Sequence, residues 1–439
     1  MSNFWYQSVA CLLFLCLIIV SCSDEPDRMY DMYEGDPIVF NPDGGWCWFQ
    51  DERAIIDEGK LLIGSVSSTG DITLTHYNFE SAESDTLTIH YQFQQNDHAQ
   101  PALIKRTDGR YLINYSGHFG EYSKWRISEE PGDPTRWGPV QQVDVGDLVT
   151  YSNLYHLQDN DRTYNFHRGI DWHPNVMVSD DDGDSWEYLG RLFIEEGERP
   201  YPRYASNGQS RIHFVTTNAH PRDFVNNIYH GYVENDRLFN SEGTEIGAID
   251  GAETERTTDD FTMIFEGDEE NIPWTSDIRI DADGHPYIAY SVTKDRIRTG
   301  EGGMDHRYRY ARWDGEQWND YEIAYAGTRL YANEDEYTGL IVLDPDDPDI
   351  VYISTDVQPE SGEPLISEST GEPQYEIFKG STSDSGENWN WEAITEHSAE
   401  DNIRPYITSD GSDRALLWLR GEYRTYTDYS LEIVGYVSR

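Results

Sequence analysis

Short runs of apolar or alternating apolar and polar residues recur along the chain, and turns rich in Gly, Asp and Asn separate them. Helical periodicity is nearly absent. Both features are typical of an all-β protein. The runs group into a unit of roughly 45–60 residues, which is the size of a propeller blade.

Each unit reads as a strand, a tight polar turn, a second strand and one or two outer strands. The seven expected pairs of inner strands are 60–64 with 71–74, 101–104 with 111–115, 153–157 with 163–166, 201–205 with 212–215, 277–280 with 287–290, 339–343 with 350–353, and 406–408 with 415–418. Residues 38–40 are expected to complete the last blade or the first. The prediction is a single-domain, seven-bladed β-propeller. Two long insertions, 242–261 and 359–372, could hide or mimic strands.

Two segments carry a sharper signature. Residues 179–186 fit the Asp-box Ser-x-Asp-x-Gly-x-Ser/Thr-Trp, and residues 382–389 fit it with Asn388 in place of the Ser/Thr. In such a box the Asp and Ser side chains bond the turn backbone, Gly takes a positive φ, and Trp packs between strands. The box is therefore expected to be structural and not catalytic.

The N-terminus is expected to lie outside the fold. Residues 12–20 are apolar but too few to span a membrane, and they end just before Cys22. This resembles a bacterial lipoprotein signal, with 1–22 as the signal peptide, Cys22 as the lipidated residue, 23–36 as an acidic tether and 37–439 as the propeller. The acidic residues after Cys22 favour an exported lipoprotein at the outer-membrane cell surface. A simple tether facing the inner leaflet is the alternative.

The chain is strongly acidic, so a cluster of cationic residues would be informative about its function. The 439 residues include 82 Asp and Glu against 32 Lys and Arg, for a net charge of −50. Nucleic acid is excluded as a partner, because no basic stripe is available for phosphates. Cys47 is the one cysteine outside the signal segment, so no intrachain disulfide is expected in the propeller. A cluster of cations would stand against this acidic background.

Such a cluster is predicted at one face of the propeller. The loop after the second strand of each blade opens near the central channel, so equivalent positions of different blades converge. The cationic residues at these positions are His118, His167, Arg168, His220, Arg222, Lys294 and Arg420. A concave cationic patch in an acidic body would attract an anionic ligand. Each residue alone could instead pair with a neighbouring acid.

First strands offer a second set of residues at the channel mouth. Arg199, Tyr201, Arg203 and Tyr204 precede or begin the first strand of blade four. Tyr204 could equally be a strand aromatic packed between blades. His, Tyr and Arg suit β-elimination at a uronic acid, which needs a neutralised carboxylate, a base and an acid. Glycoside hydrolysis normally uses two carboxylates, and the many Asp and Glu residues leave that reaction open.

Several motifs, taken in order, resemble the BNR-4 repeat proteins. They are residues 43–54, 115–118, 150–153, 199–201 and 211–214 leading to His220. That superfamily includes the ulvan lyases of polysaccharide lyase families 24 and 25 and a related family of glycosidases that remove rhamnose capping glucuronic acid. The resemblance implies a seven-bladed propeller and a His/Tyr elimination. The resemblance implies that the glycosidases rely on a His in this Trp-Phe segment. This chain has Gln50 there, which argues against glycosidase activity.

When the site residues of the family are carried over to this chain, the resemblance implies that His118 is the lyase histidine and Tyr204 the lyase tyrosine. His220 is expected as a third catalytic residue. The carboxylate neutraliser could be Arg222, Arg203 or a protonated His220. Substrate contacts are expected from Asn153, His167, Arg168, Arg199, Tyr201, Arg203, Arg222, Lys294 and Arg420. No cofactor is expected in the chemistry. A structural zinc ion could use Cys47, His213, His220 or His230, and Asp-rich turns could hold calcium.

These expectations lead to one main hypothesis and two alternatives. The main one is a monomeric lyase for a uronic-acid-containing, sulfated, ulvan-like polysaccharide. The first alternative is a glycoside hydrolase acting on a uronic-acid-containing glycan, and the second is a surface glycan-binding lipoprotein without catalysis. Contact with a membrane is expected only through the lipid.

Overall fold

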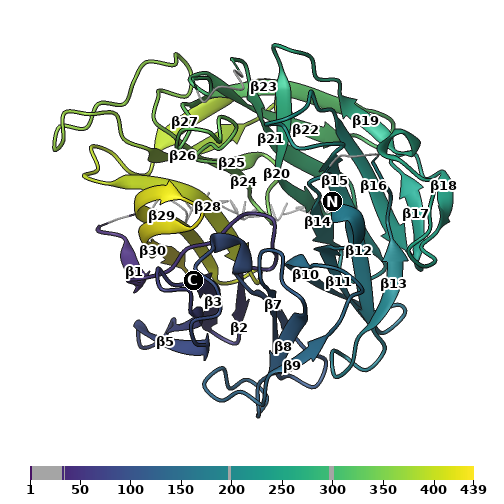
Figure 1. Cartoon of the computed structure of the whole chain (residues 1–439). Coiled ribbons are helices and arrows are strands. Elements are labelled where there is room, and N and C mark those ends of the chain that lie inside the picture. The colour runs from purple at the N-terminus through teal and green to yellow at the C-terminus, as the bar shows by residue number, and fades with distance from the viewer. Residues whose placement is uncertain (2–31, 34, 196–198, 296–300) are drawn as a thin grey trace.

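The computed structural model describes residues 1, 32, 33, 35–195, 199–295 and 301–439, and these residues form an all-β, seven-bladed propeller. Each blade is an antiparallel sheet, with its first strand near the channel and its last at the periphery (Figure 1). Cys22 and the predicted signal peptide lie outside the described residues, so lipid anchoring stays a prediction. No described helix is long and apolar enough to cross a membrane.

Blades one to four are formed by strands β2 to β19. Blade one is β2 (Ala54–Asp57), β3 (Lys60–Val66), β4 (Ile72–Asn78) and β5 (Glu83–His90); blade two is β6 (Ala102–Lys105), β7 (Tyr111–Ser116), β8 (Ser123–Ile127) and β9 (Gln141–Val143); blade three is β10 (Thr150–Leu157), β11 (Arg162–Arg168), β12 (Pro174–Ser179) and β13 (Glu187–Arg191); blade four is β14 (Arg203–Ser206), β15 (Arg211–Thr217), β16 (Ile228–Glu234), β17 (Arg237–Asn240), β18 (Glu245–Ala248) and β19 (Thr262–Phe265).

The remaining strands complete the circle. Blade five is β20 (Ile272–Ile280), β21 (Pro286–Thr293), β22 (His306–Trp313) and β23 (Trp318–Gly327); blade six is β24 (Ile341–Leu343), β25 (Ile350–Thr355), β26 (Glu376–Thr382) and β27 (Trp389–Ala393); blade seven is β28 (Asp401–Ser409), β29 (Arg414–Thr425), β30 (Asp428–Ser438) and β1 (Ile38–Asn41). Three short 3-10 helices, η2 (Asp97–Ala99), η3 (Ile170–Trp172) and η4 (Thr258–Asp260), lie in the loops.

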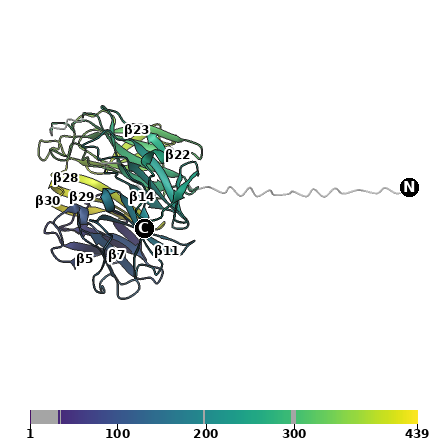
Figure 2. The same ribbon diagram turned by 45° about the vertical axis from the view of Figure 1, so that its right-hand side comes forward.

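The N-terminal strand closes the ring. β1 pairs antiparallel with β30, so blade seven joins the two ends of the chain, as predicted for residues 38–40. Figure 2 shows the C-terminal sheet beside the first blade, and β28 contacts β2. Met32 and Tyr33, which the sequence placed in the tether, pack beside blades six and seven, where Tyr33 hydrogen-bonds Tyr352.

The predicted inner strands match the structure in six blades and are shifted in blade one. Residues 60–64 and 71–74 belong to β3 and β4, the second and third strands, because β2 precedes them. β2, residues 54–57, is short and follows an irregular aromatic segment. The sequence pattern therefore did not predict it as a separate strand. The insertion 242–261 contains β18, which extends blade four, whereas residues 359–372 contain no strand.

Both Asp-boxes form the expected turns. Ser179 Oγ donates to Asp181, the backbone N–H of Gly183 donates to Ser179 Oγ at 2.7 Å, and Gly183 has a φ of 91°. In the second box, the amide of Asn388 donates to Asp384 at 2.8 Å and replaces the usual hydroxyl. Each box joins the third and fourth strands of its blade, far from the channel.

An aromatic plug fills the channel under one face. Trp48 lies against Phe49, Trp274 and Tyr337, with ring centroids 4.7, 4.8 and 5.2 Å away, and its indole N–H donates to the carbonyl of Thr275. The segment around Trp48 crosses from blade seven to blade one, so it ties inner strands of several blades together. The channel is therefore a packed core, and its mouth has a solid floor on which side chains can be positioned.

Candidate functional site

Two kinds of loop open onto the face above the plug. In a four-stranded antiparallel blade, the loop after the second strand and the loop leading to the next blade lie at the same end of the sheet. The site residues predicted from the sequence come mainly from the loops after second strands. The structure brings both kinds together, and the candidate site contains residues from each.

His98 lies in a loop between blades one and two, on η2, and is oriented by Asp97. Its Nδ1 is 2.6 Å from Asp97 Oδ1. Burial raises the pKa of Asp97, but the charges of Arg404 and His98 outweigh burial and bring the pKa to about 2. Asp97 is thus an ionised acceptor, so His98 Nδ1 must donate. When His98 is neutral, its Nε2 carries a lone pair and can accept a proton.

Asp97 is held from its other side. Arg404 Nη1 donates to Asp97 Oδ2 at 2.6 Å, and the hydroxyl of Tyr423 donates to the same oxygen at 2.7 Å. Arg404 is fully buried, so this ion pair is shielded from water. The arrangement fixes the carboxylate, and the carboxylate in turn fixes the ring of His98 and its tautomer.

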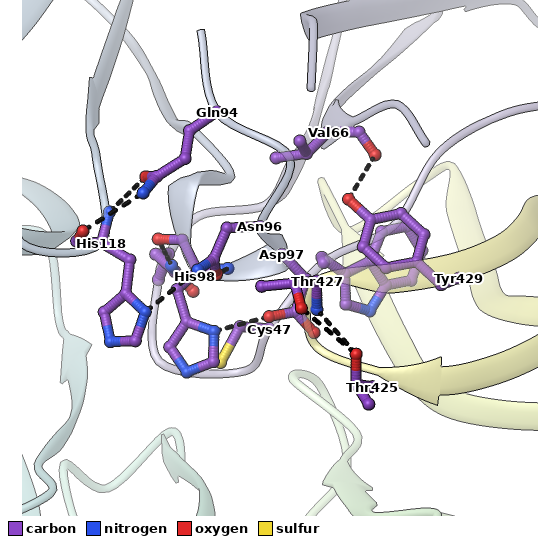
Figure 3. Close-up of polar contacts among 12 residues, drawn as sticks. Cys47, Val66, Gln94, Asn96, Asp97, His98, His118, Thr425, Thr427 and Tyr429 are labelled. Carbon is purple, nitrogen blue, oxygen red and sulfur yellow. Dashed lines mark hydrogen bonds and ion pairs between the residues drawn. The ribbon is translucent and has the colours of Figure 1, made fainter. Parts of the chain in front are cut away.

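His118 stacks on His98 (Figure 3). The two rings are 4.4 Å apart and 14° from parallel. Asn96 Oδ1 accepts from the backbone N–H of His98, which turns the Asn96 amide nitrogen toward His118 Nδ1 at 3.0 Å. His118 Nδ1 must therefore accept, and Nε2 carries the proton. Burial and the neighbouring His98 lower the pKa of His118 to about 2, so this ring stays neutral.

Arg168, at the end of β11, lies in a box of four aromatic rings. Its guanidinium carbon is 4.9 to 5.7 Å from the ring centroids of Tyr151, Phe119, Trp172 and Tyr201. Only 6% of the residue is exposed, and it forms no ion pair with any described residue. Its Nη1 donates to Tyr201 Oη at 3.1 Å, and Nη2 has no hydrogen-bond partner among those residues. A buried guanidinium without a carboxylate is ready for an anionic ligand.

Tyr201 connects Arg168 to a third histidine. The ring of His220 packs edge-on against Tyr201 with centroids 5.0 Å apart. Since arginine can only donate, Tyr201 Oη accepts from Arg168, and its own proton is free to be donated elsewhere. His220 Nδ1 accepts from the backbone N–H of Arg222 at 3.1 Å, and burial and nearby arginines lower the pKa of His220 well below its usual range.

Two glutamates lie beside His220. Glu336 is 2% exposed, and burial together with the charge of Glu334 raises its pKa well above the usual range. Glu334 pairs with Arg222 Nη1 at 2.7 Å. The ligand atoms of His220, Glu334 and Glu336 lie within 4.8 Å of one another.

Two groups of residues have the composition of a metal site. One is His220 with Glu334 and Glu336, and the other is Cys47 with Asp97 and His98. In the second group burial raises the pKa of Cys47 to about 12, which keeps the thiol protonated and disfavours the thiolate that a metal needs. His213 and His230, which were also considered as zinc ligands, hydrogen-bond each other at 3.1 Å inside blade four.

Comparison with known proteins identifies the family. The profile of the BNR repeat-containing family matches residues 62–326, which is more than half of the chain. The chain belongs to the BNR repeat-containing family. This confirms the resemblance read from the motifs. No curated protein sequence matches the chain.

Solved structures share the fold of this BNR family member at low sequence identity. An ulvan lyase of polysaccharide lyase family 25, solved with -[GlcA(1-4)Rha3S]- bound, has a TM-score of 0.67 and 15% identity over 91% of this chain and 96% of its own. A second structure of such an ulvan lyase has a TM-score of 0.68 with the same identity and coverage. The polysaccharide lyase Uly1 has a TM-score of 0.57 and 9% identity over 89% and 90% of the two chains.

Six of the residues predicted from the sequence gather around the mouth of this BNR propeller. They are His118, Arg168, Arg199, Tyr201, His220 and Arg222. Arg199 lies over the ring of Trp172 at 5.3 Å, and Arg222 faces Glu334. The predicted cationic cluster therefore exists in blades two to four.

Four predicted residues lie in the packed interior instead. Tyr204 is 3% exposed, and its ring stacks on Phe166 at 4.5 Å between blades three and four, the packing that the alternative reading of this residue anticipated. Arg203 is fully buried and pairs with Asp51 and Asp277. Asn153 donates to two backbone carbonyls, and His167 lines a small cavity with Tyr204. Asn153, His167 and Tyr204 line this cavity together with Tyr151 and Arg168 of the site.

Two further predicted residues lie apart from the histidines. Lys294 follows β21 on the same face, where its ammonium donates to Asn271. Arg420 is inside the long strand β29 and not in a loop, and it pairs with Glu432 at 2.6 Å. Neither contacts another residue of the site described above.

His98, Asp97, Tyr151 and Trp172 were not predicted from the sequence as site residues. A signal for the first two existed, because residues 96–98 form a polar Asn-Asp-His run in a loop that joins two blades. Tyr151 carries another signal that only the structure reveals, a positive φ of 73° in a bulged strand. Such backbone strain in a bulky residue is typical of functional sites.

Proposed function

We propose that this protein is a polysaccharide lyase that cleaves an anionic, uronic-acid-containing, ulvan-like polysaccharide by β-elimination. The observation that carries the proposal is Arg168, a buried guanidinium that pairs with no described carboxylate of this acidic chain, next to the stacked rings of His98 and His118. Elimination needs an anion-neutralising group beside a base, and these residues supply both.

His98 acts as the base. Its Nε2 takes the proton from C5 of the uronate, and Asp97 stabilises the resulting imidazolium through the hydrogen bond to Nδ1. The electron pair of the C5–H bond forms the C4=C5 double bond as the C4–O4 bond breaks. During this step negative charge develops on the carboxylate, where Arg168 and the Nε2–H of His118 stabilise it.

Tyr201 acts as the acid. Its hydroxyl gives a proton to the departing O4, and Arg168 stabilises the phenolate that remains. The products are a new sugar end and an unsaturated uronyl residue, so no water is consumed.

The test is incubation of the purified protein with ulvan while far-ultraviolet absorbance and reducing ends are followed together. We expect absorbance to rise in step with new ends, since elimination creates a conjugated double bond. New reducing ends without absorbance would show hydrolysis instead. Binding without either product would show a glycan-binding protein and overturn the proposal.

Two nearby tyrosines provide a matched test of the acid. Tyr201→Phe should reduce kcat by about 10²–10⁴-fold, because the proton donor is lost. Tyr204→Phe should retain activity, because that hydroxyl lies in the interior. Both rings are at least 95% buried, so the two variants are comparable in packing. Steady-state kinetics on ulvan with thermal melts of both proteins check the prediction, and equal activity of the two variants would contradict it.

A further inference from the structure

Two large aromatic side chains remain exposed at the mouth of the channel. Phe119 is 36% exposed and Trp172 is 40% exposed, whereas most large apolar residues of the chain are buried. They come from the loops after the second strands of blades two and three. Their rings meet with centroids 4.6 Å apart and planes inclined by 54°. Together they make an apolar ledge, which we call the Phe119–Trp172 platform.

The backbone holds both rings in a costly conformation. Phe119 has a φ of 62° and Trp172 a φ of 68°, values that bulky residues rarely adopt. Hydrogen bonds hold the two residues there: the N–H of Phe119 donates to Thr150 Oγ1 at 2.9 Å, and the N–H of Trp172 donates to the carbonyl of Gly169 at 2.8 Å. Strain of this kind is kept where presenting a side chain matters more than local stability.

The platform is continuous with the candidate site. Phe119 stacks on His118 with centroids 4.1 Å apart, so a row of rings runs from His98 through His118 and Phe119 to Trp172. A polymer whose uronate lies at His98 and Arg168 meets the platform with its next sugar if it runs along this row.

Cations flank the platform in a chain that is otherwise acidic. Arg168 lies 5.4 Å from the centroids of both rings, and Arg199 lies 5.3 Å from the centroid of Trp172. The side chain of Arg199 is 26% exposed and can reach a ligand. A partner that combines an apolar face with an anionic group matches this surface, and an anionic sugar ring has both.

We propose that Phe119 and Trp172 form an aromatic subsite that stacks against the pyranose ring next to the cleaved uronate, with Arg199 binding a sulfate or carboxylate on that ring. The assignment of the neighbouring ring rests on the proposed lyase function. The stacking itself needs only that the glycan binds. Loss of the aromatic ring should weaken binding at this subsite without altering the groups that move protons.

The experiment measures binding of ulvan oligosaccharides by calorimetry in a His98→Ala background, which prevents turnover. Trp172→Ala should raise Kd roughly tenfold, because aromatic residues at the centre of a contact carry much of its binding energy. Trp172→Phe should keep most of the affinity. Tyr91→Ala, which removes a 76% exposed aromatic elsewhere, is the matched control and should leave Kd unchanged. Arg199→Gln should reduce the preference for sulfated over desulfated oligosaccharides.

The outcomes separate this inference from the proposed function. If the unmutated protein cleaves ulvan by elimination but Trp172→Ala binds as tightly as the background, the subsite is wrong and the lyase stands. If Trp172→Ala weakens binding while the unmutated protein makes no unsaturated product, the stacking surface stands and the lyase is wrong. Thermal melts confirm that each variant is folded before its Kd is interpreted.

Discussion

Replacement of His98 by alanine is expected to abolish turnover of ulvan and to leave the propeller folded. His98 offers a base whose orientation is fixed by Asp97, and no other described histidine has a carboxylate bond of comparable length. Loss of a positioned base typically costs about 10²–10⁴-fold in rate. The measurement is the initial rate of absorbance increase at saturating ulvan, compared with the unmutated protein.

A half-buried histidine outside the site provides the control. His76 lies on β4 in blade one, where it faces Asp85 at 3.9 Å, and His76→Ala should have full activity. Asp97→Asn tests the tautomer, because an amide can also donate and no longer requires His98 Nδ1 to carry the proton. For Asp97→Asn we expect a loss of activity close to that of His98→Ala. Full activity of His98→Ala would show that the base is another group and would contradict the mechanism.

The pH dependence follows from the same geometry. Asp97 and His118 have pKa values of about 2, so neither changes charge near neutral pH. Any change of kcat/KM near neutral pH would therefore come from a group other than these two, and a pH profile of kcat/KM on ulvan checks this.

Much of the fold could be predicted because it repeats. Inner strands recur with the same alternation and the same polar turns, and the two Asp-boxes mark equivalent hairpins. The one shifted blade shows the limit of the pattern. β2 is four residues long and follows the aromatic segment at Trp48, whose packing into the channel depends on side chains from other blades.

The site was predicted only in part, and for a geometric reason. Equivalent positions after second strands led to His118, Arg168 and His220. His98 lies in the other class of loop on the same face, so a reading restricted to second strands could not include it. The case of Tyr201 and Tyr204 is subtler. Tyr204 lies on β14 and packs on Phe166 between blades, whereas Tyr201 precedes the strand, and this difference depends on tertiary packing.

Two buried arginines should respond to mutation in opposite ways. Arg168 pairs with no carboxylate in the described part of the chain, whereas Arg203 lies between Asp51 and Asp277 with its side chain fully buried. Arg168→Met should therefore lower kcat/KM at least about 10²-fold, because the developing carboxylate charge loses its cation. It should change the melting temperature little, since no ion pair is broken.

Arg203→Met should do the reverse. It removes one of the two cations beside each of two buried carboxylates, since Asp51 keeps Arg53 and Asp277 keeps Arg279. Breaking a buried ion pair costs up to about 3–5 kcal/mol. We expect a clear loss in the free energy of unfolding by chemical denaturation, with the catalytic residues still in place in the protein that remains folded. Because both side chains are long, buried and replaced by the same residue, packing differences largely cancel. If Arg168→Met instead destabilised the protein as strongly as Arg203→Met and kept its specific activity, Arg168 would be a structural residue, and the site would lack the anion-neutralising group on which the elimination depends.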